Sequence, residues 1–133
     1  MTEPYKLLLV DDDKEIIEAL RPRLISEGYN VAVAYDGEDA LLKLKEEDPD
    51  IILLDLMLPK LDGYQVLKEI REKYTDKWRP VIISSAKGEL DSVKECYKLE
   101  ADHYLTKPCD MENILRGIRT MISLIPLRNA NKN

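Results

Sequence analysis

Five short apolar runs, separated by segments with helical spacing, constrain the fold of this 133-residue chain more than any other feature. They occupy residues 7–10, 31–35, 51–54, 81–83 and, more weakly, 104–105. Continuously apolar strands are buried on both faces, which is typical of a parallel sheet covered by helices on both sides. The alternation therefore predicts an α/β fold, a doubly wound (βα)5 unit whose parallel five-stranded sheet has the flavodoxin-like order 2-1-3-4-5.

The segments between these runs carry the apolar periodicity of helices. Gly28 is placed to end the first helix in a left-handed conformation. The fourth helix, at about 89–99, is expected to turn Leu90, Val93 and Tyr97 inward.

The last helix opens at Asp110, a favourable N-cap residue, and Pro126 is expected to end it. We therefore predict one folded domain at residues 1–125. Residues 126–133 would form a polar tail or the start of a linker.

Aspartates directly follow the first and third apolar runs. Asp11 and Asp12 come after the first run, and Asp55 comes after the third. In this topology ligands bind at the carboxyl ends of strands 1 and 3, so we expect these carboxylates to converge and to raise one another's pKa values. A hard divalent cation such as Mg2+ would relieve their repulsion. Asp13 is better explained as the N-cap of the first helix.

Two further polar groups follow strands 4 and 5. Ser85 lies at the end of the fourth strand, and Lys107, followed by Pro108, lies at the end of the fifth. A hydroxyl and an ammonium group beside several carboxylates would neutralise and orient an added phosphoryl group.

Composition excludes several classes of protein. With a net charge of -6, the chain lacks the basic footprint of a nucleic-acid-binding protein, so direct binding to nucleic acid is not expected. The apolar run after the N-terminus is too short for a secretion signal or a membrane span, so a cytoplasmic protein is expected. Cys96 and Cys109 lack metal-ligand spacing and are expected to be reduced thiols.

Taken together, these motifs resemble the receiver domain of two-component response regulators, and the resemblance covers residues 6–124. The segments that carry it are Asp11-Asp12, Asp55-Leu-Met-Leu-Pro, Asp62-Gly63, Ser85-Ala86 and Tyr104-Leu-Thr-Lys107-Pro108.

The resemblance implies that Asp55 is the phosphoacceptor, attacking a phosphohistidine to form an acyl phosphate. It implies that Asp12 and Asp55 bind Mg2+ directly, that the backbone carbonyl of Met57 is a further ligand, and that Asp11 acts largely through water. A receiver catalyses only its own phosphoryl transfer and slow dephosphorylation, so the chain is not expected to be an enzyme.

The resemblance also implies a switch. Lys107 would pair with a phosphoryl oxygen, and its bond to Pro108 would be cis. Ser85 would move to bond the phosphoryl group, and Tyr104 would turn inward behind it, altering the face formed by helix 4, strand 5 and helix 5. The implied partners are a sensor histidine kinase or phosphotransfer protein and a downstream protein or output domain.

Two positions depart from the usual receiver pattern, with Glu100 in place of Gly and Cys109 in place of Phe. We expect Glu100 to adopt a left-handed conformation, and we expect both departures to affect the partner-binding face rather than the phosphate chemistry. Lys87 and Met57 flank the predicted site and are expected to tune the phosphoryl lifetime, Lys87 more strongly because it is charged.

Several alternatives stay open at this point. One is an aspartate-nucleophile phosphohydrolase of the haloacid dehalogenase type, in which Asp11 and Asp13 would form the Asp-x-Asp motif, although Asp55 would then have no role. A flavin-binding module of the same topology is disfavoured because three aspartates would repel the flavin phosphate. Also open are a free-standing or an excised receiver, and a phosphorylation-dependent homodimer.

Overall fold

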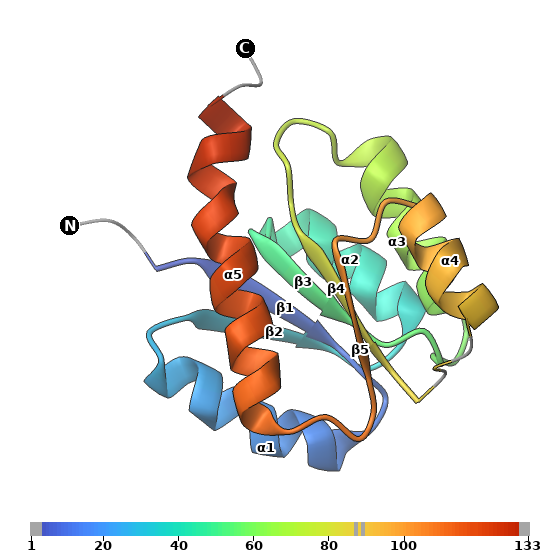
Figure 1. The fold of residues 1–133 in the computed structure, drawn as a ribbon, viewed down its shortest axis with the longest axis horizontal. Helices are drawn as coiled ribbons and strands as arrows, with labels where there is room; N and C mark the ends of the chain where they lie inside the picture. The colour runs from blue at the N-terminus through green and yellow to red at the C-terminus, as the bar shows by residue number, and fades with distance from the viewer. Residues whose placement is uncertain (1–3, 87, 89, 131–133) are drawn as a thin grey trace.

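The structure is a computed structural model that describes residues 4–86, 88 and 90–130. Five strands alternate with five helices (Figure 1). In chain order they are β1 (Lys6–Val10), α1 (Lys14–Ser26), β2 (Asn30–Ala34), α2 (Gly37–Glu47), β3 (Ile51–Leu54), α3 (Gly63–Lys73), β4 (Val81–Ser85), α4 (Leu90–Lys98), β5 (His103–Thr106) and α5 (Met111–Ala130). Within the described part of the chain, no helix combines the length and the apolar character needed to cross a membrane.

The five strands form one parallel sheet in the order β2-β1-β3-β4-β5, which confirms the predicted topology. The register places Leu9 of β1 between Val33 of β2 and Leu53 of β3. The winding reverses between β1 and β3, so the carboxyl ends of these two strands adjoin without a crossover helix between them.

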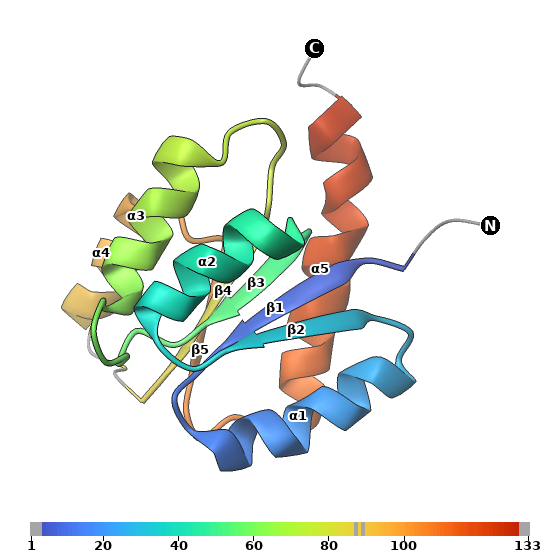
Figure 2. The ribbon, with the colours of Figure 1, turned by 180° about the vertical axis from the view of Figure 1, so that it is seen from behind.

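Helices cover both faces of the sheet, α1 and α5 on one side and α2, α3 and α4 on the other (Figures 1 and 2). Successive residues of a strand point to opposite faces. Each central strand therefore contributes to two cores, and an unbroken apolar run is what burial on both faces requires. The α1/α5 core contains Leu7, Leu9, Ile51 and Leu53, whereas the opposite core contains Leu8, Val10, Ile52 and Leu54.

The inward face of α4 differs from the prediction. Leu90 and Tyr97 are 66% and 47% exposed, whereas Ser92 and Cys96 are buried. Smaller side chains thus occupy the buried positions of this helix, and the larger apolar side chains face outward. The prediction for Leu90 and Tyr97 was wrong, and it leaves two apolar side chains on the surface of α4.

The end of α5 also differs from the prediction, because the helix continues through Pro126 to Ala130. Asn129 accepts a hydrogen bond from the backbone N–H of Trp78 (2.7 Å) and donates one to its carbonyl oxygen (3.4 Å). The Arg128 guanidinium stacks on the Trp78 ring, 4.1 Å from its centroid, and lies 3.7 Å from Asp102. These contacts stabilise the last turn and offset the hydrogen bond that a proline cannot donate.

The predictions made for Asp13, Gly28 and Glu100 at the other helix ends are confirmed. Asp13 caps α1 by accepting hydrogen bonds from the backbone N–H groups of Glu15 and Ile16. Gly28 has φ +99° just beyond α1, and Glu100 has φ 66° beyond α4. Glu100 thus adopts the left-handed conformation predicted for it, at a cost of about 1 kcal/mol.

We expect Asn129→Ala to fray the end of α5, because both of its hydrogen bonds to Trp78 would be lost. Amide hydrogen exchange after Pro126 should accelerate, and the free energy of unfolding should fall by about 1 kcal/mol. Ser123→Ala is the matched control, since Ser123 bonds only the Thr120 carbonyl within the same helix. Equal exchange rates in the two variants would show that Trp78 does not hold the helix end.

Candidate functional site

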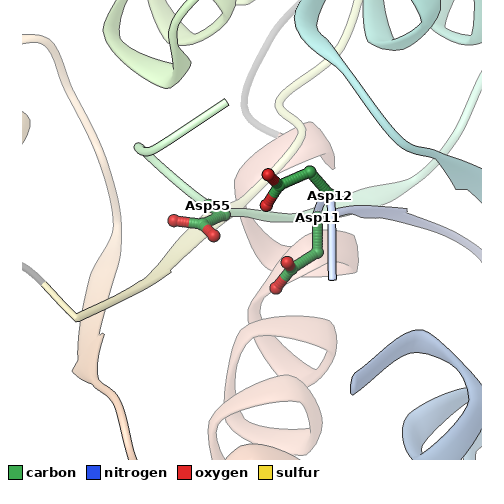
Figure 3. A group of neighbouring side chains, drawn as sticks. All are labelled: Asp11, Asp12 and Asp55. Atoms are coloured by element: carbon green, nitrogen blue, oxygen red, sulfur yellow. The ribbon is translucent and has the colours of Figure 1, made fainter. Parts of the chain in front are cut away.

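The carboxyl ends of β1 and β3 bring three aspartates together (Figure 3). The sheet fixes two of them directly, because the N–H of Asp11 donates to the Ala34 carbonyl (3.1 Å) and that of Asp55 donates to the Val10 carbonyl (2.9 Å). Asp11 and Asp55 are each 6% exposed, whereas Asp12 is exposed to solvent.

One oxygen from each of Asp11, Asp12 and Asp55 lies within 4.8 Å of the others. A cluster of carboxylate oxygens at this spacing suits a hard divalent cation such as Mg2+, which prefers oxygen ligands and retains several waters. Met57, the other expected ligand residue, lies beside Asp55, and its backbone N–H donates to Asp55 Oδ1 (3.0 Å).

Lys107 connects the two buried carboxylates. Its Nζ lies 2.6 Å from Asp11 Oδ2 and 3.0 Å from Asp55 Oδ2. The N–H of Lys107 donates to the Ser85 carbonyl (2.8 Å), which extends the β4–β5 pairing and fixes where the side chain begins. The Lys107–Pro108 peptide bond is cis, as the resemblance implied.

Burial and ion pairing shift the pKa values of these groups in opposite directions. Burial raises the pKa of Asp11, and the hydrogen bonds from Lys107 and from the Asp13 N–H only partly offset it. Burial alone would lower the pKa of Lys107, but its hydrogen bonds to Asp11 and Asp55 outweigh that effect and raise it. Lys107 is therefore held in its charged form.

The loop after Asp55 is packed closely against the start of α3. Asp62 caps α3 and forms a capping box with Gln65. The N–H of Gly63 donates to the Leu56 carbonyl (3.0 Å), and a Cβ at Gly63 would lie 2.4 Å from the Asp55 carbonyl oxygen. Only glycine permits this approach, so Gly63 helps to set the position of Asp55.

Ser85 and Tyr104 lie on the neighbouring strands β4 and β5. Ser85 is fully buried, Tyr104 is half-buried, and their side chains are hydrogen-bonded. Burial raises the pKa of the Tyr104 phenol, and the hydrogen bond with Ser85 opposes that effect. The two residues predicted to move together are thus already in contact.

The sequence did not reveal a cavity of about 450 Å³ that extends from Asp11, Asp55 and Lys107 into the space between α1 and α5. Cys109 lines this cavity. Its thiol therefore lines the same cavity as the buried carboxylates, and the expectation that Cys109 leaves the phosphate chemistry unchanged stays a prediction. Lys87, the other residue expected to act near the site, lies outside the described residues.

Comparisons with known proteins agree with this geometry. The sequence model of the family described as the response regulator receiver domain matches residues 7–119. The receiver domain of the Francisella response regulator 1452 is 33% identical, with a TM-score of 0.82, over 90% of this chain and 97% of that chain. A chain in the CheX–CheY–BeF3–Mg2+ complex from Borrelia burgdorferi is 35% identical, with a TM-score of 0.81, over 90% of each chain. Chemotaxis response regulator CheY4 of Vibrio cholerae is 27% identical, with a TM-score of 0.82, over 88% and 98% of the two chains.

We expect Gly63→Ala to displace the loop that follows Asp55, because the added Cβ meets backbone on that loop. The free energy of unfolding should fall by about 1 to 3 kcal/mol, and the amide NMR signals of Asp55 and Met57 should shift. Gly28→Ala is the control, since a Cβ there meets no atom within 4 Å. It should cost about 1 kcal/mol from its positive φ alone and leave the Asp55 signal in place. Unshifted Asp55 and Met57 signals in Gly63→Ala would contradict the positioning role.

Proposed function

Because this chain belongs to the response regulator receiver domain family of two-component signalling, we propose that Asp55 accepts a phosphoryl group from a sensor histidine kinase or a phosphotransfer protein. The observation that carries the proposal is the arrangement around Asp55. A carboxylate at the end of β3 is paired with Lys107 from the end of β5 and adjoins Asp11 and Asp12 from the end of β1. Generic substrates are not turned over, since the protein modifies only itself.

In the proposed reaction an oxygen of Asp55 attacks the phosphorus of a phosphohistidine. The new O–P bond gives an acyl phosphate, the P–N bond breaks, and its electron pair stays on the imidazole nitrogen. Lys107 can turn from Asp55 to an oxygen of the bound phosphoryl group while it keeps its hydrogen bond to Asp11. Its positive charge would stabilise the negative charge on the phosphoryl oxygens.

Asp12 and Asp55 are the proposed direct Mg2+ ligands, with the Met57 carbonyl as a third and Asp11 acting through water. Asp12 is exposed and open to a cation, whereas each oxygen of Asp11 already accepts a hydrogen bond, one from the Asp13 N–H and one from Lys107. Bound Mg2+ would reduce the repulsion between the carboxylates and the incoming phosphoryl group.

Ser85 and Tyr104 are the proposed switch. If the Ser85 hydroxyl turns to donate to the phosphoryl group, its hydrogen bond with Tyr104 breaks unless Tyr104 follows it. Tyr104 already packs against the core beneath β4, which supports an inward position. Two discrete arrangements of this pair would carry the phosphorylation signal to the surface.

We propose the surface formed by α4, β5 and α5 as the region that meets a downstream protein or output domain. The exposed apolar side chains of Leu90 and Tyr97 support this assignment, because residues seven positions apart lie on the same face of a helix. The receiver unit is proposed to include α5, whose helical structure extends past the predicted boundary at residue 125.

Incubation with a small acyl phosphate and Mg2+ should add the mass of one phosphoryl group to the wild-type protein. The gain should disappear in Asp55→Asn and without divalent metal, because the nucleophile or the charge neutralisation is then missing. Intact mass spectrometry measures the result. Asp13→Asn is the matched control, since its amide oxygen can still cap α1 while the neighbouring aspartates stay unchanged.

An unmodified wild-type protein under those conditions would refute the proposal. Turnover of a generic phosphate ester that is lost in Asp11→Asn and kept in Asp55→Asn would instead support the phosphohydrolase alternative.

Asp12→Asn should raise the Mg2+ dissociation constant by about tenfold or more, because it removes a negative charge from the ligand cluster. A Mg2+ titration followed by the amide NMR signals of Asp55 and Met57 measures this change. Asp91→Asn, an exposed aspartate on α4, is the control and should leave the affinity unchanged. Equal affinities in the two variants would remove Asp12 from the ligand set.

A further inference from the structure

The cavity of about 450 Å³ beside the acidic cluster has apolar walls. Helix α1 contributes Ile16 and Leu20, and α5 contributes Met111 and Ile114, while Leu9 and Leu53 of the sheet also line it. The two helices lie side by side in both views (Figures 1 and 2) and are joined at the surface by an ion pair between Arg23 and Glu112 (3.1 Å).

The polar end of this cavity carries excess negative charge. Asp11, Asp55 and Lys107 line it, and Asp12 lies beside them. Two carboxylates thus face a single ammonium group, that of Lys107, and Asp12 adds a third negative charge next to the cavity. Before any metal binds, the local field favours a cation over a neutral molecule and disfavours an anion.

We propose that this cavity binds a small organic cation, a primary ammonium group joined to a compact aryl or branched alkyl body. The body would lie against the apolar walls between α1 and α5, and the ammonium group would lie among the carboxylates. The space is ample, because an apolar cavity of about 150 Å³ already accommodates benzene. This binding requires no phosphorylation, and only its competition with Mg2+ rests on the proposed metal site.

The proposal also predicts that the organic cation and a divalent metal compete for binding. Asp55 is a proposed Mg2+ ligand and also lines the cavity, so the metal and the organic cation would share its carboxylate. Because the coupling is reciprocal, metal should weaken binding of the organic cation by the same factor by which the cation weakens binding of metal.

Small side chains at two positions leave the cavity open. Cys109 lines it at the loop before α5, and Ala19 lines it from an exposed position on α1. A larger side chain at either position would occupy the space that the apolar body needs. Ala19 is uncharged and lies outside the carboxylate cluster, so Ala19→Leu tests the cavity without altering the charges.

The test is a titration of metal-free protein with phenethylammonium, followed by calorimetry and by the NMR methyl signals of Leu20 and Ile114. We expect a dissociation constant of about 0.1 to 1 mM, the range for a ligand of this size. Ethylammonium lacks the apolar body and phenylacetate carries the opposite charge, so both should bind at least about tenfold more weakly. Saturating Mg2+ should raise the dissociation constant of phenethylammonium by about fivefold or more.

Ala19→Leu and Cys109→Phe should each raise the dissociation constant of phenethylammonium by about fivefold or more, because the larger side chains fill the cavity. Ser123→Leu, an exposed change on α5 away from the cavity, is the matched control and should bind as the wild type does. Contacts between the ligand ring and the Leu20 and Ile114 methyl groups in the wild type test the position without any variant. The proposal is overturned if these methyl signals do not shift or if phenylacetate binds as tightly as phenethylammonium.

Discussion

The pairing of one ammonium group with two buried carboxylates is the interaction on which the rest of this site depends. Asp11 and Asp55 lie at the ends of adjacent strands with almost no exposure, where unpaired charges would be very unfavourable. From the end of β5, Lys107 reaches Asp55 across β4 and Asp11 across β4 and β3. The charges at the ends of three strands are therefore coupled, so a change at any one of them alters the other two.

Backbone contacts hold these side chains in place. Asp11, Asp55 and Lys107 each donate their N–H to a carbonyl of a neighbouring strand, which extends the sheet pairing up to the functional residues. Gly63 lets α3 begin in contact with the backbone at Asp55. A second buried charge lies near the amino ends of β3 and β4, where Arg79 bonds the carboxylates of Asp48 and Asp76. Charged groups thus hold both ends of the central strands, and the apolar cores lie between them.

The residues that could be predicted from the sequence are those governed by local rules. Apolar runs buried on both faces gave the strands, and the topology then required Asp11, Asp55 and Lys107 to converge. The errors arose where distant contacts decide the structure. Leu90 and Tyr97 have helical spacing, but packing on the sheet selected the stripe with Ser92 and Cys96. The end of α5 depends on Trp78, 51 residues before Asn129 in the chain. The cavity could not be predicted either, because an unfilled space between helices corresponds to no residue pattern in the sequence.

The two ends of α5 have different mechanical freedom. The helix is 20 residues long, about 30 Å, and its first residue, Met111, follows Lys107 by only three intervening positions. Its far end is clamped at Trp78 by Asn129 and Arg128. A helix held at one end can tilt about that end but cannot shift along its own axis. Displacement of Lys107 would therefore reach α5 as a rotation about Trp78, greatest beside the acidic cluster and vanishing at the clamp.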